Sequence, residues 1–149
     1  MPLHRIYHTQ GTFNADEKKE LAKRITNVYT AGGLPAFYVV VLFVPIEVED
    51  FFVSGEQNIH NFVRISVQHV ARHMGQDVQR KRFFERYENA LAPFIKEKGF
   101  DWEIQIEEHD MNLWRENGLQ PPIPQSKAEK EWIRLNKPVP FDDKDNFVV

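Results

Sequence analysis

The strongest constraint on the fold is a plan of strand, helix and strand that occurs twice along the chain. In its first occurrence, residues 1–50, a weak strand pattern over 1–10 precedes a helical stretch, and the apolar run AFYVVVLFVPI follows. That run is rich in β-branched and aromatic residues and bounded by proline, which predicts a strand buried on both faces. A helix between two strands is typical of an α/β fold.

The first helix has clear boundary signals. Asn14 is a good N-cap, and Glu17 three positions later nearly completes a capping box. Gly32 and Gly33 are expected to end the helix. Its apolar stripe consists of Leu21, Ala22, Ile25, Val28 and Tyr29, at the spacing of one helix face.

Residues 51–110 repeat the plan after a connection that has room for a short hairpin. We expect Asp77 to cap the second helix, Gly99 to close it, and Pro93 to kink or split it. The apolar positions assigned to the strands and to the core side of the helix are Phe62, Ile65, Val67, Phe84, Tyr87, Leu91, Ile95, Trp102, Ile104 and Ile106.

Beyond residue 110 the pattern changes to a C-terminal extension, residues 111–149. It contains a short helical turn near Leu113–Glu116, a proline segment, and a second helix capped by Ser126. Trp114 and Trp132 make it too apolar for free disorder. We expect it to pack over the body of a single domain, 1–149, or onto a neighbouring subunit.

Composition narrows the function classes. The net charge of −3 argues against nucleic-acid binding, which needs a clustered basic face. The absence of cysteine excludes disulfides and thiolate chemistry, and it fits a cytoplasmic protein. No apolar run approaches the roughly 18–20 residues that span a bilayer, and no signal peptide is recognisable.

Histidines and arginines supply the first candidates for chemistry. His69 and His73 lie four apart, but at a strand end and in the following turn, so no metal site is expected. Arg72 follows that strand directly, where its forked donors can bind a carboxylate. The basic run QRKRFFER is interpreted as a solvated helix face that carries Arg80, Lys81 and Arg82.

Pro2 admits two interpretations. Proline has no amide hydrogen and is tolerated at the start of a strand, which is the structural interpretation. Alternatively, the initiator methionine is removed before this small residue, and the new terminus is a secondary amine that can move protons in a pocket. Retention of Met1 would leave an amide that cannot titrate.

Glu116 is the carboxylate with the most unusual setting. It lies in LWRENGLQPP, between Trp114 and a rigid proline segment. Partial desolvation there would raise its pKa into a useful acid–base range, although an ordinary surface salt bridge would explain it equally well.

Taken together, these features resemble the tautomerase superfamily, and most closely its cis-3-chloroacrylic acid dehalogenase family. The resemblance rests on Pro2, the tandem units, Arg72, and the segments YHTQGTFNADEKKELAKRIT, FFVSGEQ and LWRENGLQPP. It implies two β-α-β units forming a four-stranded mixed sheet with two helices on one face. It also implies a homotrimer.

The resemblance implies a role for several residues. The catalytic proline of the family matches Pro2, its water-activating glutamate matches Glu116, and one of its two arginines matches Arg72. The substrate-binding histidine of its first helix falls on Tyr29. The second arginine falls on Val70 or His73, and the tyrosine of the last strand falls near Gln105.

The activity implied is cofactor-free proton transfer on a small 2-oxo, enol or unsaturated carboxylic acid. Pro2 would move the proton as base or acid. Arg72, with Tyr29, His69 and Trp114, would bind substrate, and Glu116 would activate water. Two alternatives stay open: hydration, dehalogenation or decarboxylation on the same fold, and a trimeric binding protein with a vestigial pocket.

Overall fold

The computed structural model describes residues 1–148, and its centre is a four-stranded mixed sheet in the order β2-β1-β5-β6. β1 pairs with β2 in parallel and β5 with β6 in parallel, while β1 and β5 are antiparallel. The strands are β1 (Leu3–Thr9), β2 (Val40–Ile46), β5 (Val63–His69) and β6 (Trp102–Glu108). The fold class expected from the sequence is therefore confirmed.

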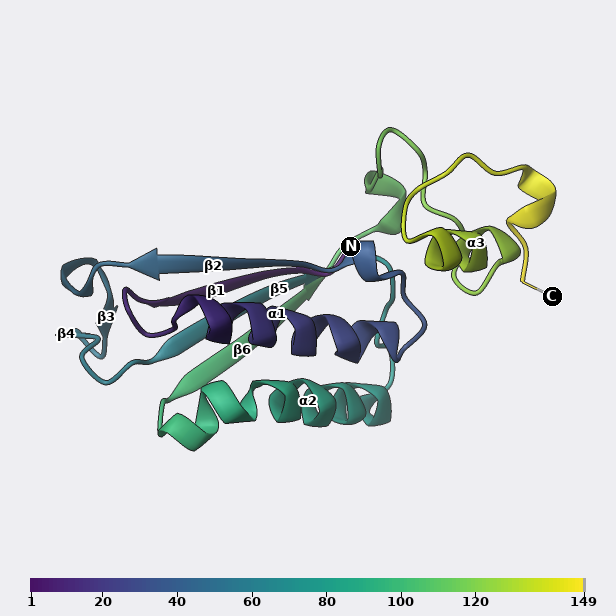
Figure 1. The fold of residues 1–149 in the computed structure, drawn as a ribbon. Helices are drawn as coiled ribbons and strands as arrows, with labels where there is room; N and C mark the ends of the chain where they lie inside the picture. Colours follow the sequence, from purple (N-terminus) through teal and green to yellow (C-terminus); the bar gives the residue numbers. More distant parts are fainter. Residues whose placement is uncertain (149) are drawn as a thin grey trace.

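Two long helices cover one face of this sheet (Figure 1). They are α1 (Ala15–Thr30) and α2 (Asp77–Leu91), each of which connects two parallel strands. Alternate residues of β1 and β5 are buried beneath them, which is the period-two pattern of a sheet with one covered face. The buried strand residues on this side are His4, Ile6, His8, Val63, Ile65, Val67 and His69.

Most element boundaries expected from the sequence are confirmed. Asn14 caps α1, and its side chain and that of Glu17 form a reciprocal capping box. α2 ends at Leu91, and Pro93 lies in the turn of 3-10 helix that follows at Ala92–Phe94. The connection after β2 holds a small hairpin, β3 (Phe52–Val53) and β4 (Glu56–Gln57), preceded by a 3-10 turn at Val48–Asp50.

Five details expected from the sequence were wrong. β2 is an edge strand with half-buried and exposed residues rather than a strand buried on both faces, and Leu42 is 45% exposed. Apolar composition signals that a surface can be buried, but not what buries it. The cap of α2 is Gln76 rather than Asp77, since the Gln79 side chain accepts from the Gln76 N–H (3.2 Å).

The other three errors are small shifts of position along the chain. Val63, not Phe62, begins the inward row of β5, and on α2 the half-buried Phe83 rather than Phe84 packs on the core. The short helical turn of the extension lies at Met111–Leu113, just before the position expected.

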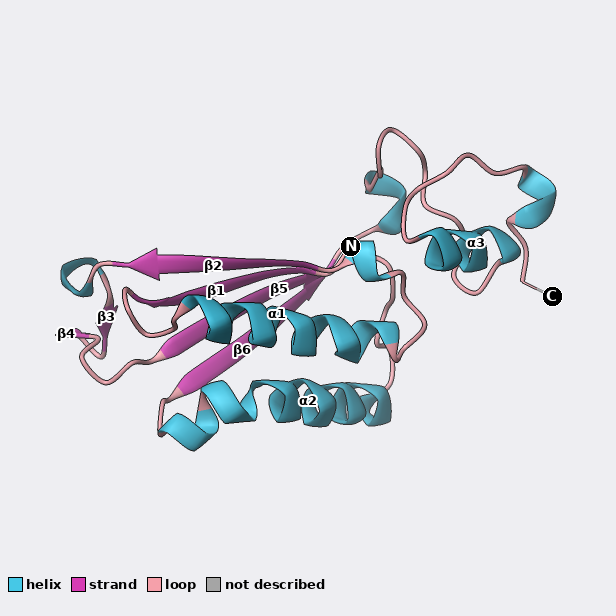
Figure 2. Cartoon of the chain, viewed as in Figure 1, coloured by secondary structure: helices cyan, strands magenta, loops and turns pink. Residues whose placement is uncertain are grey.

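The C-terminal extension packs at the end of the sheet where the chain begins (Figure 2). Its helix α3 (Lys127–Leu135) is capped by Ser126, as the sequence predicts. Trp132 is fully buried, lies 5.9 Å from the ring of Phe37, and donates to the Val139 carbonyl (2.7 Å). The remaining short elements are 3-10 turns at Ala36–Tyr38, Lys96–Lys98 and Asp143–Asp145.

None of the helices in residues 1–148 combines the length and the apolar character required to cross a membrane.

A buried histidine in the core makes the fold sensitive to acid. His4 is fully buried, its Nδ1 lies 2.7 Å from the Tyr87 hydroxyl, and its Nε2 has no partner. Burial, aided by the nearby His69, lowers the pKa of His4 from 6.5 to about 3. The unfolded chain therefore binds a proton between these values that the folded chain does not, so stability falls as the pH falls through that window.

We predict that the double variant that combines His4→Phe with Tyr87→Phe loses less stability in acid than the unaltered protein. Each pH unit below 6.5 costs the unaltered chain up to about 1.4 kcal/mol through His4. The second substitution removes the Tyr87 hydroxyl, which would otherwise lose its hydrogen-bond partner His4. Chemical denaturation at neutral and at mildly acid pH measures the free energy of unfolding. His60→Gln, an exposed histidine, is the control. A double variant with the pH dependence of the unaltered chain would contradict this assignment.

Candidate active site

The candidate site lies at one end of the sheet because the pairing of strands brings four chain segments together there. β1 begins where the antiparallel β5 ends, and Leu3 is paired with Gln68. β2 also begins at this end, and the Val40 N–H donates to the Pro2 carbonyl (3.0 Å). β6 ends beside β5 through the pair His69 and Glu108. α1, running back along the sheet, carries Tyr29 in its last turn to the same place.

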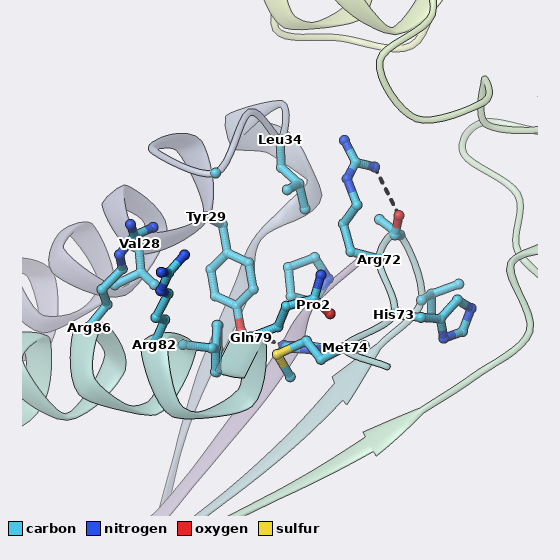
Figure 3. Close-up of a pocket in the computed structure, with 15 residues that line it drawn as sticks. Pro2, Val28, Tyr29, Leu34, Arg72, His73, Met74, Gln79, Arg82 and Arg86 are labelled. Atoms are coloured by element: carbon cyan, nitrogen blue, oxygen red, sulfur yellow. Dashed lines mark hydrogen bonds between the residues drawn. The ribbon is translucent and has the colours of Figure 1, made fainter. Parts of the chain in front are cut away.

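A cavity of about 390 Å³ opens at this end. Four of the site residues expected from the sequence line it: Pro2, Tyr29, His69 and Arg72 (Figure 3). Its apolar side comprises Val28, Leu34, Val70, Ala71, Met74 and Phe83. A mostly apolar cavity with a few convergent polar groups is the usual form of a small-molecule site.

Tyr29 and His69 act as a pair rather than as separate groups. The Tyr29 hydroxyl and His69 Nε2 lie 2.7 Å apart and share a hydrogen bond. Burial lowers the pKa of His69 from 6.5 to about 4, an effect that Glu108 opposes and the terminal amine reinforces. Burial also raises the pKa of Tyr29. At neutral pH the pair is therefore uncharged and offers hydrogen bonds without charge.

The chain terminus lies within the field of two charged side chains of this site. Burial lowers the pKa of the Met1 terminal amine from 8.0 to about 4; Glu116 acts in the opposite direction, and Arg72 lowers that pKa further. Desolvation and a neighbouring cation both disfavour an ammonium ion. An amine in this environment is neutral near pH 7.

Glu116 is held by a tight turn and by a tryptophan. Glu116 and Leu119 exchange both backbone hydrogen bonds (2.9 and 2.8 Å) across Asn117 and Gly118, which have the positive φ values of 49° and 79°. This is the arrangement that favours an Asn-Gly turn. Trp114 Nε1 donates to Glu116 Oε1 (3.2 Å).

The pKa of Glu116 is raised by burial, against the lowering effects of the Trp114 hydrogen bond and the terminal amine. Glu116 and Trp114 do not line the cavity itself, so the structure separates them from Pro2, Tyr29, His69 and Arg72. Their connection to the site is the electrostatic effect of Glu116 on the terminus.

Sequence reasoning missed two arginines. Arg82, which the sequence assigns to a solvated face, and Arg86 both line the cavity from α2 (Figure 3). Both are exposed and form its outer rim. Gln79 also lines the cavity. The signal was present, since positions 79, 82, 83 and 86 fall on one helix face, but polar residues at this spacing are common on solvated helices.

Both positions considered for a second arginine, Val70 and His73, line the cavity as well. His73 Nδ1 lies 2.9 Å from Glu108 Oε2, so this imidazole is already engaged by a carboxylate. Gln105, on β6, near which the tyrosine of the family's last strand falls, does not line the cavity. Its side-chain oxygen accepts a hydrogen bond from Arg64. Among residues 1–148, no cluster of three or more histidine, aspartate and glutamate side chains has the geometry to hold a metal ion.

Comparison with known proteins places this arrangement in a family. Residues 1–137 match the family model described as "Putative oxalocrotonate tautomerase enzyme". No curated protein matches the chain.

Solved structures agree with the family match. Native RhCC from Rhodococcus jostii RHA1 is 44% identical, over 93% of this chain and 99% of that one, with a TM-score of 0.90. A "probable enzyme" of the thermophilic fungus Aspergillus fumigatus is 43% identical, over 95% and 98% of the two chains, with a TM-score of 0.89.

A more distant structure shares the fold. N1, a member of the cis-3-chloroacrylic acid dehalogenase family, is 16% identical over 87% of this chain and 89% of that one, with a TM-score of 0.67. The match over residues 1–137 and the two relatives above 40% identity lead to one conclusion: this chain belongs to the oxalocrotonate tautomerase family described above, within the tautomerase superfamily.

Proposed function

We propose that Met1 is removed and that the secondary amine of Pro2 transfers protons to and from carbon in a small 2-oxo, enol or unsaturated carboxylic acid, without a cofactor. One observation carries the proposal: Pro2 lines the same cavity as Arg72 and the Tyr29–His69 pair. A proton-transfer group, a carboxylate anchor and uncharged hydrogen-bonding groups are the parts that an enolisation needs.

The reaction needs a neutral amine as its base. The Met1 amine, one residue away, has its pKa lowered by burial and by Arg72. The Pro2 amine would meet the same apolar walls and the same guanidinium, so its pKa would also be lowered. With an enol as substrate, Pro2 then removes the hydroxyl proton and returns it at carbon, so the amine is neutral again at the end and no net atoms are gained or lost.

Arg72 would hold the substrate carboxylate, and its positive charge would stabilise the enolate that develops next to it. Tyr29 and His69 would donate or accept hydrogen bonds on the opposite side of the cavity. Arg82 and Arg86 add positive charge at the rim, which favours entry of an anion.

Hydration, dehalogenation or decarboxylation on the same fold is a second candidate, and the setting of Glu116 favours it. Burial raises the pKa of Glu116, which brings a carboxylate toward the range useful for activating water. Trp114 fixes its orientation. This reaction requires the protonated form of Pro2 as the acid that protonates carbon, whereas the tautomerase reaction requires the neutral form.

We further propose that residues 1–149 act as one domain in a cytoplasmic homotrimer. β2 carries exposed Leu42 at the sheet edge, a surface suited to a neighbouring subunit. A fold neighbour, at 15% identity and a TM-score of 0.60, is described as a fused 4-OT asymmetric trimer.

We predict that Pro2→Ala lowers kcat/KM for phenylenolpyruvate or 2-hydroxymuconate by about 100-fold or more, the usual contribution of a general acid or base. Both chains should show an intact mass lower by one methionine residue, because alanine is also small. Pro140→Ala, an exposed proline of the extension, is the matched control and should keep full activity. Unaltered turnover in Pro2→Ala across these substrates and cis- and trans-3-chloroacrylate would favour a binding protein with a vestigial pocket.

We predict that Glu116→Gln separates the two reaction types. Glu116 raises the pKa of the Met1 amine, and we expect it to act in the same direction on the Pro2 amine, so its loss lowers that pKa. With Pro2 as base, kcat/KM falls as the pH drops through the amine pKa, and this limb should move to lower pH in Glu116→Gln. Hydration of 3-chloroacrylate should instead lose about 100-fold in kcat. Glu107→Gln, half-exposed on β6, is the control, and an unmoved acid limb would refute the coupling.

A further inference from the structure

An arginine of the cavity is bound by a carboxylate from outside the two β-α-β units. Glu129 Oε2, on α3 of the C-terminal extension, lies 2.8 Å from Arg72 Nη2. The Glu129 side chain is 1% exposed and that of Arg72 is 27% exposed. The pair therefore has one end inside the protein and the other at the cavity.

The two contacts of Arg72 fix the plane of its guanidinium. Nη1 donates to the carbonyl of Ala71 (2.9 Å), and Nη2 donates to Glu129 (2.8 Å). In Figure 3 the Arg72 guanidinium points away from Arg82 and Arg86 on α2, and a dashed line marks its hydrogen bond to the Ala71 carbonyl. Arginine has five N–H donors in a rigid fork, so the remaining donors have directions that these two contacts determine.

Glu129 is itself held firmly. Its Oε2 also accepts from the Gln125 N–H (2.6 Å), and its own N–H donates to Ser126 Oγ (3.1 Å). The end of α3 is attached to the body, because the Phe37 N–H donates to Asn136 Oδ1 (2.9 Å). The carboxylate is thus a fixed point from which Arg72 is oriented.

This pair is poorly suited to stability alone. Glu129 Oε1 is buried without a hydrogen-bond partner, and so is the hydroxyl of Tyr38, whose pKa is raised by burial and by Glu129. Replacing a buried ion pair with apolar residues often leaves stability unchanged or improved. A charge kept at this cost, on a residue that contacts a cavity arginine, points to a role in the site.

We propose that Glu129 is a positioning residue that orients Arg72 for binding of the substrate carboxylate, so that the C-terminal extension completes the active site. This rests on the proposed function, in which Arg72 anchors that carboxylate. Without Glu129, the guanidinium is free to rotate toward solvent, and the carboxylate loses its directed donors. Substrate binding should then weaken more than the chemical step.

The test compares Glu129→Gln with Glu131→Gln on the same helix, whose exposed partner is Arg134. Glu129→Gln should raise KM for phenylenolpyruvate, and Kd for the unreactive phenylacetate measured by tryptophan fluorescence, by about tenfold or more, with a much smaller change in kcat. Glu131→Gln should change neither. The phenylacetate arm needs no turnover, so a failure of the proposed catalysis is distinguished from a failure of positioning.

A double-mutant cycle asks whether Glu129 acts through Arg72. In an Arg72→Ala background, Glu129→Gln should add little to the loss of binding. An equal loss in both backgrounds, or an unchanged KM and Kd in Glu129→Gln, would overturn the proposal. If Glu129→Gln does not fold, Glu129→Asp serves instead, because it withdraws the charge from Arg72 by one methylene. Its KM and Kd should rise in the same direction, and unchanged values in folded protein would equally overturn the proposal.

Discussion

Antiparallel pairing of β1 with β5 joins the two β-α-β units and sets the position of the site. Because the strands run in opposite directions, the start of β1 meets the end of β5, and each parallel partner carries a further segment to the same end. Pro2 is far in sequence from His69 and Arg72, and this one register brings them to the same end of the sheet. A slip of one residue would turn every side chain of β1 to the opposite face.

Burial then determines the chemistry at that end. Desolvation is the largest cause of the lowered pKa of the terminal amine and of His69, and of the raised pKa of Glu116. Each shift favours the uncharged form, while the Arg72 guanidinium is paired with the Glu129 carboxylate. Neutral groups beside Pro2, with the guanidinium of Arg72 among them and those of Arg82 and Arg86 at the rim, suit the binding of a carboxylate next to a group that exchanges protons.

The sequence predicted what depends on local pattern and on composition. The capping box of Asn14, the break at Pro93 and the Ser126 cap are short-range signals, and each was confirmed. The edge position of β2, the place of Arg82 at the cavity rim and the Glu129–Arg72 pair were not predicted. These depend on which segments meet in space, and residues 72 and 129 are separated in sequence by the whole of α2 and β6 and by the first part of the extension.

The duplicated plan does not produce two equal sites, and the register explains why. Extending it by one pair at one end sets Pro2 opposite His69, and extending it by two pairs at the other end sets Phe62 opposite Thr9. At the other end, the backbone nitrogen of Phe62 belongs to an ordinary peptide bond and does not titrate. Its N–H donates to Asn58 Oδ1 (2.8 Å). Asn58 also donates to Thr9 Oγ1 (3.1 Å) and to the Phe62 carbonyl (2.9 Å), which satisfies that end with neutral hydrogen bonds. In the proposed function the titratable backbone nitrogen is that of Pro2, and the extension that carries Glu129 and Glu116 packs at the same end of the sheet.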